Sequence, residues 1–153
     1  MQKIVLIIFG LAFAFSVSAK ESIRGHYQLV GSIPTAHSVS KVVFEEFMNF
    51  GCPHCNRLHK ASKDFRKKFA EKVEFIDIPI VFRGQDDSPL RLYYVAKKIG
   101  KGKLIKDELF KASFIHGVNV FDPGITNYLA RSLGINKEYQ QEKDQAWVNK
   151  LIK

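Results

Sequence analysis

Cysteine is scarce in this sequence, with only Cys52 and Cys55 among 153 residues. Two neighbouring cysteines cannot form the framework of separated disulfides that staples many small secreted domains. No cysteine directly follows the apolar N-terminal stretch, which argues against a lipoprotein anchor. The chain also lacks a glycine-rich phosphate loop, internal repeats and low-complexity tracts. The two thiols therefore form either a redox-active pair or part of a metal site.

Long apolar runs are equally scarce, since the one such run lies at the N-terminus. It extends from Ile4 to Val17, follows the positive charge of Lys3 and is succeeded by Ser18 and Ala19. Residues 1–19 are therefore predicted to be a signal peptide that is cleaved before Lys20. As a helix the run would cover about 21 Å, which is short of a hydrocarbon core of about 30 Å and argues against an uncleaved anchor. We expect export to the periplasm, where disulfides persist.

Acidic residues are outnumbered, with 15 Asp and Glu against 24 Lys and Arg and a formal net charge of +9. The basic residues concentrate in two segments, the first of which holds Arg57, Lys60, Lys63, Arg66, Lys67, Lys68 and Lys72, and the second Lys97, Lys98, Lys101, Lys103 and Lys106. In an exported protein these segments predict a solvated basic surface and no nucleic-acid partner. A preference for acidic or membrane-near partners stays open.

The first part of the chain shows a strand–helix–strand pattern. β-Branched and aromatic residues predict a buried central strand at Lys41–Phe50 and a second strand at Val73–Phe82. Gly51 ends the first strand, and a helix is predicted from about Cys52 to Glu71. This order is typical of a βαβ unit with parallel strands. A short edge strand is also predicted near residues 26–30.

The second part of the chain is predicted to be wholly helical. Proline and glycine signals bound helices near 88–100, 103–114 and 123–134, and a last amphipathic helix runs from Asn136 to Ile152. The predicted apolar faces consist of Leu58, Ala61, Phe65 and Phe69; Leu92, Val95, Ala96 and Ile99; Ile105, Leu109 and Ala112; and Ile125, Tyr128, Leu129 and Leu133. The predicted organisation is thus a signal peptide at 1–19, an α/β part at 20–87 and a helical part at 88–153.

The motif Cys52-Pro53-His54-Cys55 stands where the first strand gives way to the helix. A cysteine at a helix start lies near unpaired backbone N–H groups, which stabilise its thiolate. Cys55 follows one turn later, within reach for a disulfide. Pro53 suits the first helical turn because it has no N–H to leave unpaired, and His54 adds a positive or hydrogen-bonding group beside Cys52. A stabilised dithiol makes the corresponding disulfide a strong oxidant.

The segment Glu46-Phe-Met-Asn-Phe-Gly-Cys-Pro-His-Cys55 closely resembles the active site of the DsbA-type thiol:disulfide oxidoreductases of bacterial periplasms. The resemblance extends from about residue 26 to the end and implies a thioredoxin-like α/β fold with an all-helical insertion. It implies that Cys52 is the attacked cysteine, Cys55 its buried partner and His54 a group that tunes the potential. It further implies that Glu46 assists proton movement near Cys55.

The resemblance also implies partners: reduced, unfolded secreted proteins as substrates and a quinone-linked membrane protein for reoxidation, with no organic cofactor. The family has a cis-proline loop, further strands and a final helix after the insertion, and this sequence shows none of them. Pro123, its last proline, stands at a helix start. The chain is therefore expected to correspond to the front two-thirds of such a protein, without the C-terminal strands.

Two other interpretations remain open. Cys52, Cys55, His54 and His59 could hold zinc or copper, although covalent haem is excluded because Asn56 follows Cys55. Alternatively, the chain could be an inactive fragment that binds a partner through an exposed sheet edge. His26, His37 and His116 are interpreted as surface or loop residues, and the aromatic residues of the helical part as packing groups.

Overall fold

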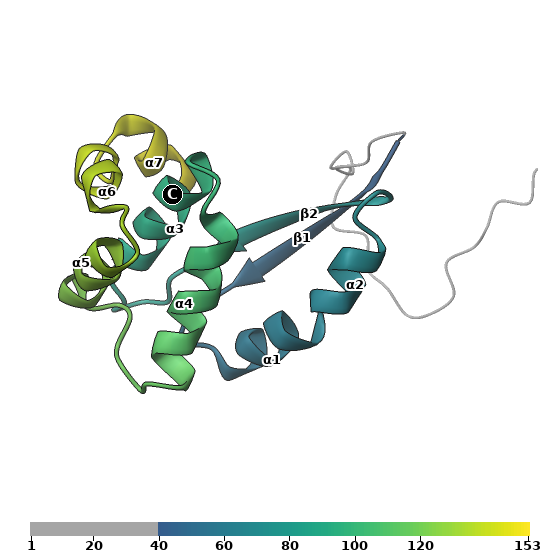
Figure 1. Cartoon of the computed structure of the whole chain (residues 1–153), viewed down its shortest axis with the longest axis horizontal. Helices are drawn as coiled ribbons and strands as arrows, with labels where there is room; N and C mark the ends of the chain where they lie inside the picture. Colours follow the sequence, from purple (N-terminus) through teal and green to yellow (C-terminus); the bar gives the residue numbers. More distant parts are fainter. Residues whose placement is uncertain (1–39) are drawn as a thin grey trace, which may run out of the picture. The chain divides into compact units, whose positions relative to one another are not determined.

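The computed structural model describes residues 40–153, which form two strands and seven helices (Figure 1). The first four elements are β1 (Val42–Met48), α1 (Pro53–Ala61), α2 (Lys63–Lys68) and β2 (Val73–Pro79), and the remainder are α3 (Ser88–Lys98), α4 (Gly102–Phe114), α5 (Pro123–Ser132), α6 (Asn136–Glu142) and α7 (Ala146–Leu151). This is a mixed α/β fold with few strands and a helical insertion, as the sequence predicts.

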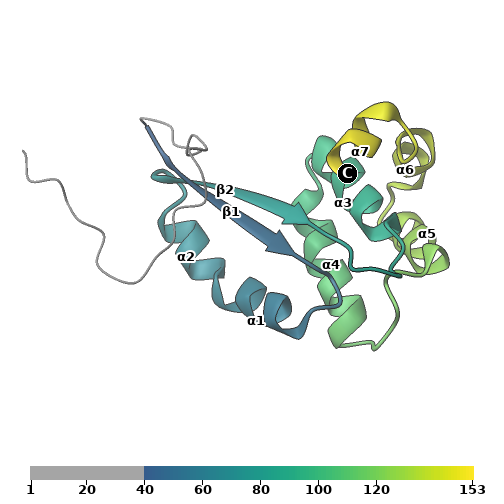
Figure 2. The same cartoon turned by 180° about the vertical axis from the view of Figure 1, so that it is seen from behind.

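The two strands pair in parallel, which confirms the predicted strand–helix–strand unit. Their register runs from Val42 opposite Val73 to Met48 opposite Pro79, and it places Glu46 opposite Asp77. Helices α1 and α2 lie along the strands, and both strands point with their carboxyl ends toward the helices α3 to α7 (Figures 1 and 2). The loop that follows β1 and carries the cysteines therefore starts at the end of the sheet that meets the helical part.

The core lies mainly among the helices of the second part of the chain. Helix α3 contributes the most buried residues, and it contacts α4, α5, α6 and α7. Met48 and Phe50 connect this core to the end of β1. The predicted packing role of the aromatic residues is confirmed, since Tyr93, Tyr94 and Phe110 are buried and Phe114 and Trp147 pack against the core.

Two predicted helices are each divided in the structure. The helix expected at 52–71 breaks at Ser62, which closes α1 and opens α2. The last helix breaks at Gln145, whose backbone is extended. Arg91 of α3 donates a hydrogen bond to the Lys143 carbonyl at 2.7 Å and so occupies the end of α6. Neither break contains Gly or Pro, so the local sequence gives no signal for it.

The prediction of a buried central strand at 41–50 is wrong for most of β1, since continuous burial begins only at Met48. Val42 is 60% exposed and Phe47 62%, because within residues 40–153 β1 pairs only with β2. For the same reason the predicted apolar stripe of the motif helix is open, with Leu58 and Phe65 both exposed. The strand at 73–82 is also shorter than predicted and ends at Pro79.

Most of the apolar faces predicted for the helical part are confirmed, but two residues differ. Tyr128 and Ile99 are exposed, whereas their helix neighbours Leu129 and Ala96 are buried. His116 lies exposed after α4, as expected. No helix within residues 40–153 has the length and hydropathy needed to cross a bilayer. The predicted signal peptide, the strand near 26–30, His26 and His37 lie outside the described residues.

Candidate active site

Asn49 holds the turn that leads from β1 to the first cysteine. Its buried side chain donates hydrogen bonds to the Ile80 carbonyl (2.9 Å) and to Gln85 Oε1 (2.7 Å), and it accepts one from the Gly51 N–H (2.9 Å). The Asn49 carbonyl accepts the Cys52 N–H at 3.0 Å. One asparagine thus ties the turn to the chain beyond β2, a role that sequence reasoning missed although Asn is a frequent turn residue.

Gly51 provides the space that this turn needs. A Cβ atom at Gly51 would lie 2.9 Å from Cε2 of Phe121, which belongs to the loop before α5. Any other residue would therefore push the aromatic ring or the turn aside. Phe121 is a second residue of the site that the sequence did not reveal, because it is distant along the chain and reaches the turn only through the fold.

Cys52 is the N-cap of α1, and Pro53 occupies the first helical turn, as predicted. A hydrogen bond from the backbone of Cys55 is the largest influence on the Cys52 thiol and lowers its pKa. Partial burial acts in the opposite direction. The Cys55 side chain and the backbone of His54 lower the pKa further, and so does the charge of Arg57. The net result is a pKa below that of an ordinary thiol, which favours the reactive thiolate.

Cys55 experiences the opposite environment. Burial is the main cause that raises the pKa of Cys55, and the neighbouring Cys52 and the charge of Glu46 raise it further. A backbone hydrogen bond from Asn49 opposes this shift without cancelling it. Both cysteines are free thiols in the structure and lie close enough to hydrogen-bond. The pair therefore combines one thiol that readily ionises with one that keeps its proton.

The side chain of His54 is exposed and contacts Arg57. The His54 Nδ1 atom accepts a hydrogen bond from Arg57 Nη2 at 2.7 Å. This contact places the guanidinium beside the start of α1, where its positive charge acts on Cys52. In the sequence Arg57 is one of many basic residues of its segment, whereas in the structure its charge belongs to the surroundings of the Cys52 thiol.

Glu46 lies buried on β1, within a cluster of four charged side chains. Arg66 of α2 donates hydrogen bonds to both Glu46 and Asp77, the latter at 2.7 Å. Lys106 of α4 lies 3.0 Å from Asp77 and 3.5 Å from Glu46. Two carboxylates and two cations thus balance, which is the condition for keeping charges inside a protein. Glu46 itself retains only 6% of its exposure.

Among residues 40–153, one oxygen of this cluster has no hydrogen-bond partner. Glu46 Oε1 is buried without a hydrogen bond among the described residues, while Oε2 takes both cations. The negative charge of Glu46 also contributes to the raised pKa of Cys55. The carboxylate with the free oxygen is therefore electrostatically coupled to the second thiol.

A partly buried pair joins α1 to α4 one turn after the motif. His59 Nε2 and Asp107 Oδ1 are 2.6 Å apart, and the imidazole stacks on Phe110 at 4.9 Å between ring centres. Burial lowers the pKa of His59 and outweighs the attraction of Asp107. The hypothesis that His59 joins His54 and the two cysteines in a metal site finds no support here, since residues 40–153 contain no group of three such ligands.

Comparison with known proteins decides the family. The profile of the thioredoxin family matches residues 32–152. The chain belongs to the thioredoxin family. Within it the chain is of the DsbA type: it is 25% identical over 131 residues to the thiol:disulfide interchange protein DsbA of Pseudomonas syringae pv. tomato, covering 86% of this chain and 60% of that protein. It is also 33% identical over 89 residues to DsbA of Escherichia coli, covering 56% of this chain and 41% of that protein.

Solved structures of DsbA proteins share the fold. The DsbA-type chain superposes on Xylella fastidiosa DsbA with a TM-score of 0.65 and 23% identity, covering 74% of this chain and 63% of the other. The TM-score to Pseudomonas aeruginosa DsbA is 0.64 at 15% identity, covering 80% and 64%. The chain therefore spans less than two-thirds of the length of these relatives, and it matches them over both the cysteine motif and the helical part.

Proposed function

We propose that this DsbA-type chain is a periplasmic thiol:disulfide oxidoreductase that donates its Cys52–Cys55 disulfide to folding secreted proteins. The observation that carries the proposal is the opposite tuning of the two thiols, with the pKa of Cys52 lowered and that of Cys55 raised. An accessible thiolate is a good leaving group and a stable reduced product, so the disulfide form is oxidising. The relatives carry the name thiol:disulfide interchange protein.

The reaction needs no organic cofactor, because the electrons are held by the two sulfurs. A substrate thiolate attacks Sγ of Cys52, the Cys52–Cys55 bond breaks, and Cys55 leaves with the electron pair and takes up a proton. A second substrate thiolate then attacks the substrate sulfur of the mixed disulfide, and Cys52 leaves as a thiolate. The substrate has lost two electrons and two thiol protons; Cys55 holds one proton, the other passes to solvent, and the enzyme is left reduced, with Cys52 as thiolate and Cys55 as thiol. A quinone-linked membrane protein is the proposed oxidant that restores the disulfide.

Within this scheme the other predicted site residues have distinct roles. Pro53 starts α1 and has no N–H to leave unpaired, so the first free backbone amides of the helix are those that hydrogen-bond to the Cys52 sulfur. His54 contributes its backbone N–H and orients Arg57. Glu46 is proposed to handle the proton of Cys55, which is supported by its burial, its free oxygen and its effect on that thiol.

The test is the oxidation of a reduced peptide with two cysteines by the preoxidised protein, together with equilibration against glutathione. We expect rapid peptide oxidation and a potential above that of thioredoxin, roughly −270 mV. The Cys52→Ser variant is expected to be inactive, whereas Cys55→Ser should trap a mixed disulfide. Alkylation of reduced protein should modify Cys52 alone at neutral pH. Equal peptide oxidation by the parent and the Cys52→Ser variant would favour the inactive-fragment alternative.

A further inference from the structure

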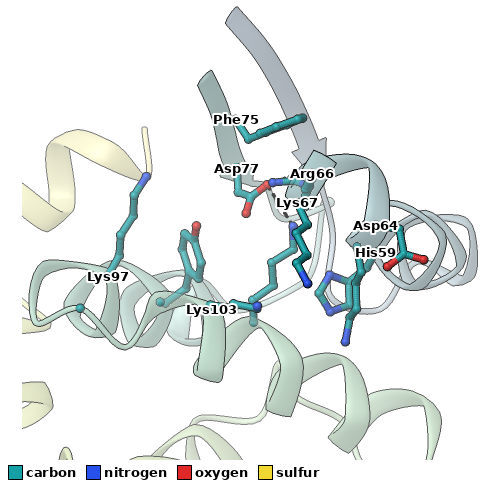
Figure 3. A pocket seen from close by; sticks show the side chains of 13 residues that line it. His59, Asp64, Arg66, Lys67, Phe75, Asp77, Lys97 and Lys103 are labelled. Carbon is teal, nitrogen blue, oxygen red and sulfur yellow. Dashed lines mark hydrogen bonds and ion pairs between the residues drawn. The ribbon is translucent and has the colours of Figure 1, made fainter. Parts of the chain in front are cut away.

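The two basic segments of the sequence meet across one cavity. This cavity has a volume of about 690 Å³ and lies between α2 on one side and α3 and α4 on the other (Figure 3). Lys63 and Lys67 line it from the first segment, and Lys97 and Lys103 from the second. The solvated basic surface expected from the sequence is thus, in part, the wall of an open cavity. Neither cysteine lines this cavity.

Three of these lysines have no acidic partner. Lys67, Lys97 and Lys103 form no ion pair within 4 Å in the part of the chain that the structure describes, and all three side chains are exposed. The other cations of the cavity are engaged: Arg66 and Lys106 with Asp77, as described above, and Lys63 with Asp107 at 3.3 Å. Asp64 also lines the cavity and forms no ion pair among residues 40–153, so it offsets one of these three charges and the cavity keeps a surplus of positive charge.

A helix N-terminus adds to this charge. Helix α4 has 13 residues, and its first two, Gly102 and Lys103, line the cavity. No side chain caps α4, and its first turn contains no acidic residue. The first N–H groups of a helix have no partner within it and carry a partial positive charge, which suits a phosphate oxygen.

The floor of the cavity is apolar. Phe75 of β2 and the largely buried ring of Tyr93 of α3 line it. Arg66 stacks over the Phe75 ring at 4.9 Å. A volume in the range of small-molecule sites, an apolar floor and a few convergent cationic groups are typical of a pocket that binds a compact amphiphilic anion.

We propose that this cavity binds a small organic phosphate, with its phosphate between Lys97, Lys103 and the start of α4 and its apolar part against Phe75 and Tyr93. The same phosphate chemistry occurs in soluble phosphate monoesters and in the headgroup of phosphatidic acid. The site is separate from the thiol pair, so occupancy does not require either redox state.

The first arm of the test uses phenyl phosphate at low ionic strength, with sodium chloride of equal ionic strength as reference. Binding to the folded state raises the unfolding temperature in proportion to ln(1 + [L]/Kd). We expect phenyl phosphate to raise this temperature more than the salt does. The Lys97→Gln/Lys103→Gln variant should bind about tenfold more weakly, since it loses two charge-assisted contacts. The matched control is Lys137→Gln/Lys150→Gln, which removes two exposed lysines of α6 and α7 outside the cavity.

The second arm distinguishes the source of the phosphate. Sedimentation with phosphatidic acid vesicles, but not with phosphatidylcholine vesicles, and its loss in the Lys97→Gln/Lys103→Gln variant would assign the lipid headgroup to this cavity. Unfolding temperatures without ligand show whether each variant is folded. Equal binding by the double variant and its control, or no effect of either probe beyond that of salt, would overturn the proposal.

Discussion

At the scale of single residues, the site depends on which groups surround each sulfur. Cys52 and Cys55 are recognisable from the sequence because their spacing and position at a helix start indicate their chemistry. Arg57, Asn49 and Phe121 are not, because their side chains act through contacts that only the folded chain creates. The sequence thus reveals the sulfur atoms that react, but not the groups that shift their pKa values or fix the turn that carries them.

The charge of Arg57 gives a prediction at this scale. Because this charge favours the thiolate, replacing Arg57 by Gln should raise the pKa of Cys52 and slow its alkylation at neutral pH. The measurement is the thiolate absorbance of the reduced protein as a function of pH. Lys60→Gln removes an exposed positive charge of the same helix that is not among the causes of the Cys52 shift, so it serves as control. Identical titration curves for the two variants would exclude the role assigned to Arg57.

At the scale of elements, the strands and the existence of the helices follow from residue patterns, but their ends do not. Ser62 divides the motif helix without a proline or glycine signal, and the end of α6 is occupied by Arg91 from α3. The exposure of Phe47 likewise depends on what lies beside β1, which a local pattern cannot show. The periodicity of a sequence indicates which face of a helix or strand is apolar, whereas the packing of neighbouring elements decides whether that face is buried.

The connection of α4 to the strands gives a second prediction. Lys106 is the contribution of α4 to the buried charge cluster, and its replacement by Met leaves Glu46 and Asp77 with Arg66 alone. We expect a loss of about 3 kcal/mol in the free energy of unfolding, measured with urea, because a buried carboxylate becomes uncompensated. Adding Asp77→Asn should recover part of this loss by restoring the charge balance.

The matched control for this variant is Lys111→Met, also on α4. Lys111 pairs with Glu108 at 3.5 Å and is exposed, so its replacement should cost at most about 1 kcal/mol. If the two lysine variants were equally stable, the cluster would contribute nothing to the docking of α4 on the strands.

At the scale of the whole molecule, the redox state and the stability of the fold are linked through Cys52. Its pKa in the folded, reduced chain lies below the value of about 8.5 expected in the unfolded chain. Between these two values the unfolded chain binds more protons, so the stability of the reduced form rises with pH and is lost as pH falls through the folded pKa. The oxidised form has no thiol to titrate.

This linkage gives the third prediction. The free energy of unfolding of the reduced form, relative to that of the oxidised form, should increase as the pH is raised from the folded pKa of Cys52 to about 8.5. The raised pKa of Cys55 has its effect above this range. Urea unfolding of both forms at several pH values measures the difference. In the reduced Cys52→Ser protein this extra increase of the free energy of unfolding with pH should vanish. If the free energies of unfolding of the reduced and oxidised wild-type forms changed in parallel with pH, the linkage would be contradicted.

The organisation of the chain as a whole was accessible to sequence in outline only. The order of a parallel strand pair followed by helices could be predicted because each segment carries its own pattern. The meeting of two basic segments across one cavity could not, since it depends on how α2 and α4 are placed in space. The division of the chain at residues 87 and 88 stays a prediction.

The hydrogen bonds of Asn49 have a kinetic consequence. The Asn49 side chain fixes the turn at three points, the Ile80 carbonyl, Gln85 Oε1 and the Gly51 N–H, and none of these contacts involves a sulfur atom. In the proposed disulfide exchange we therefore expect only the sulfur atoms to move, over bond-length distances, with little rearrangement of the scaffold. The rate of the proposed reaction would then be set by the arrival and departure of the substrate polypeptides.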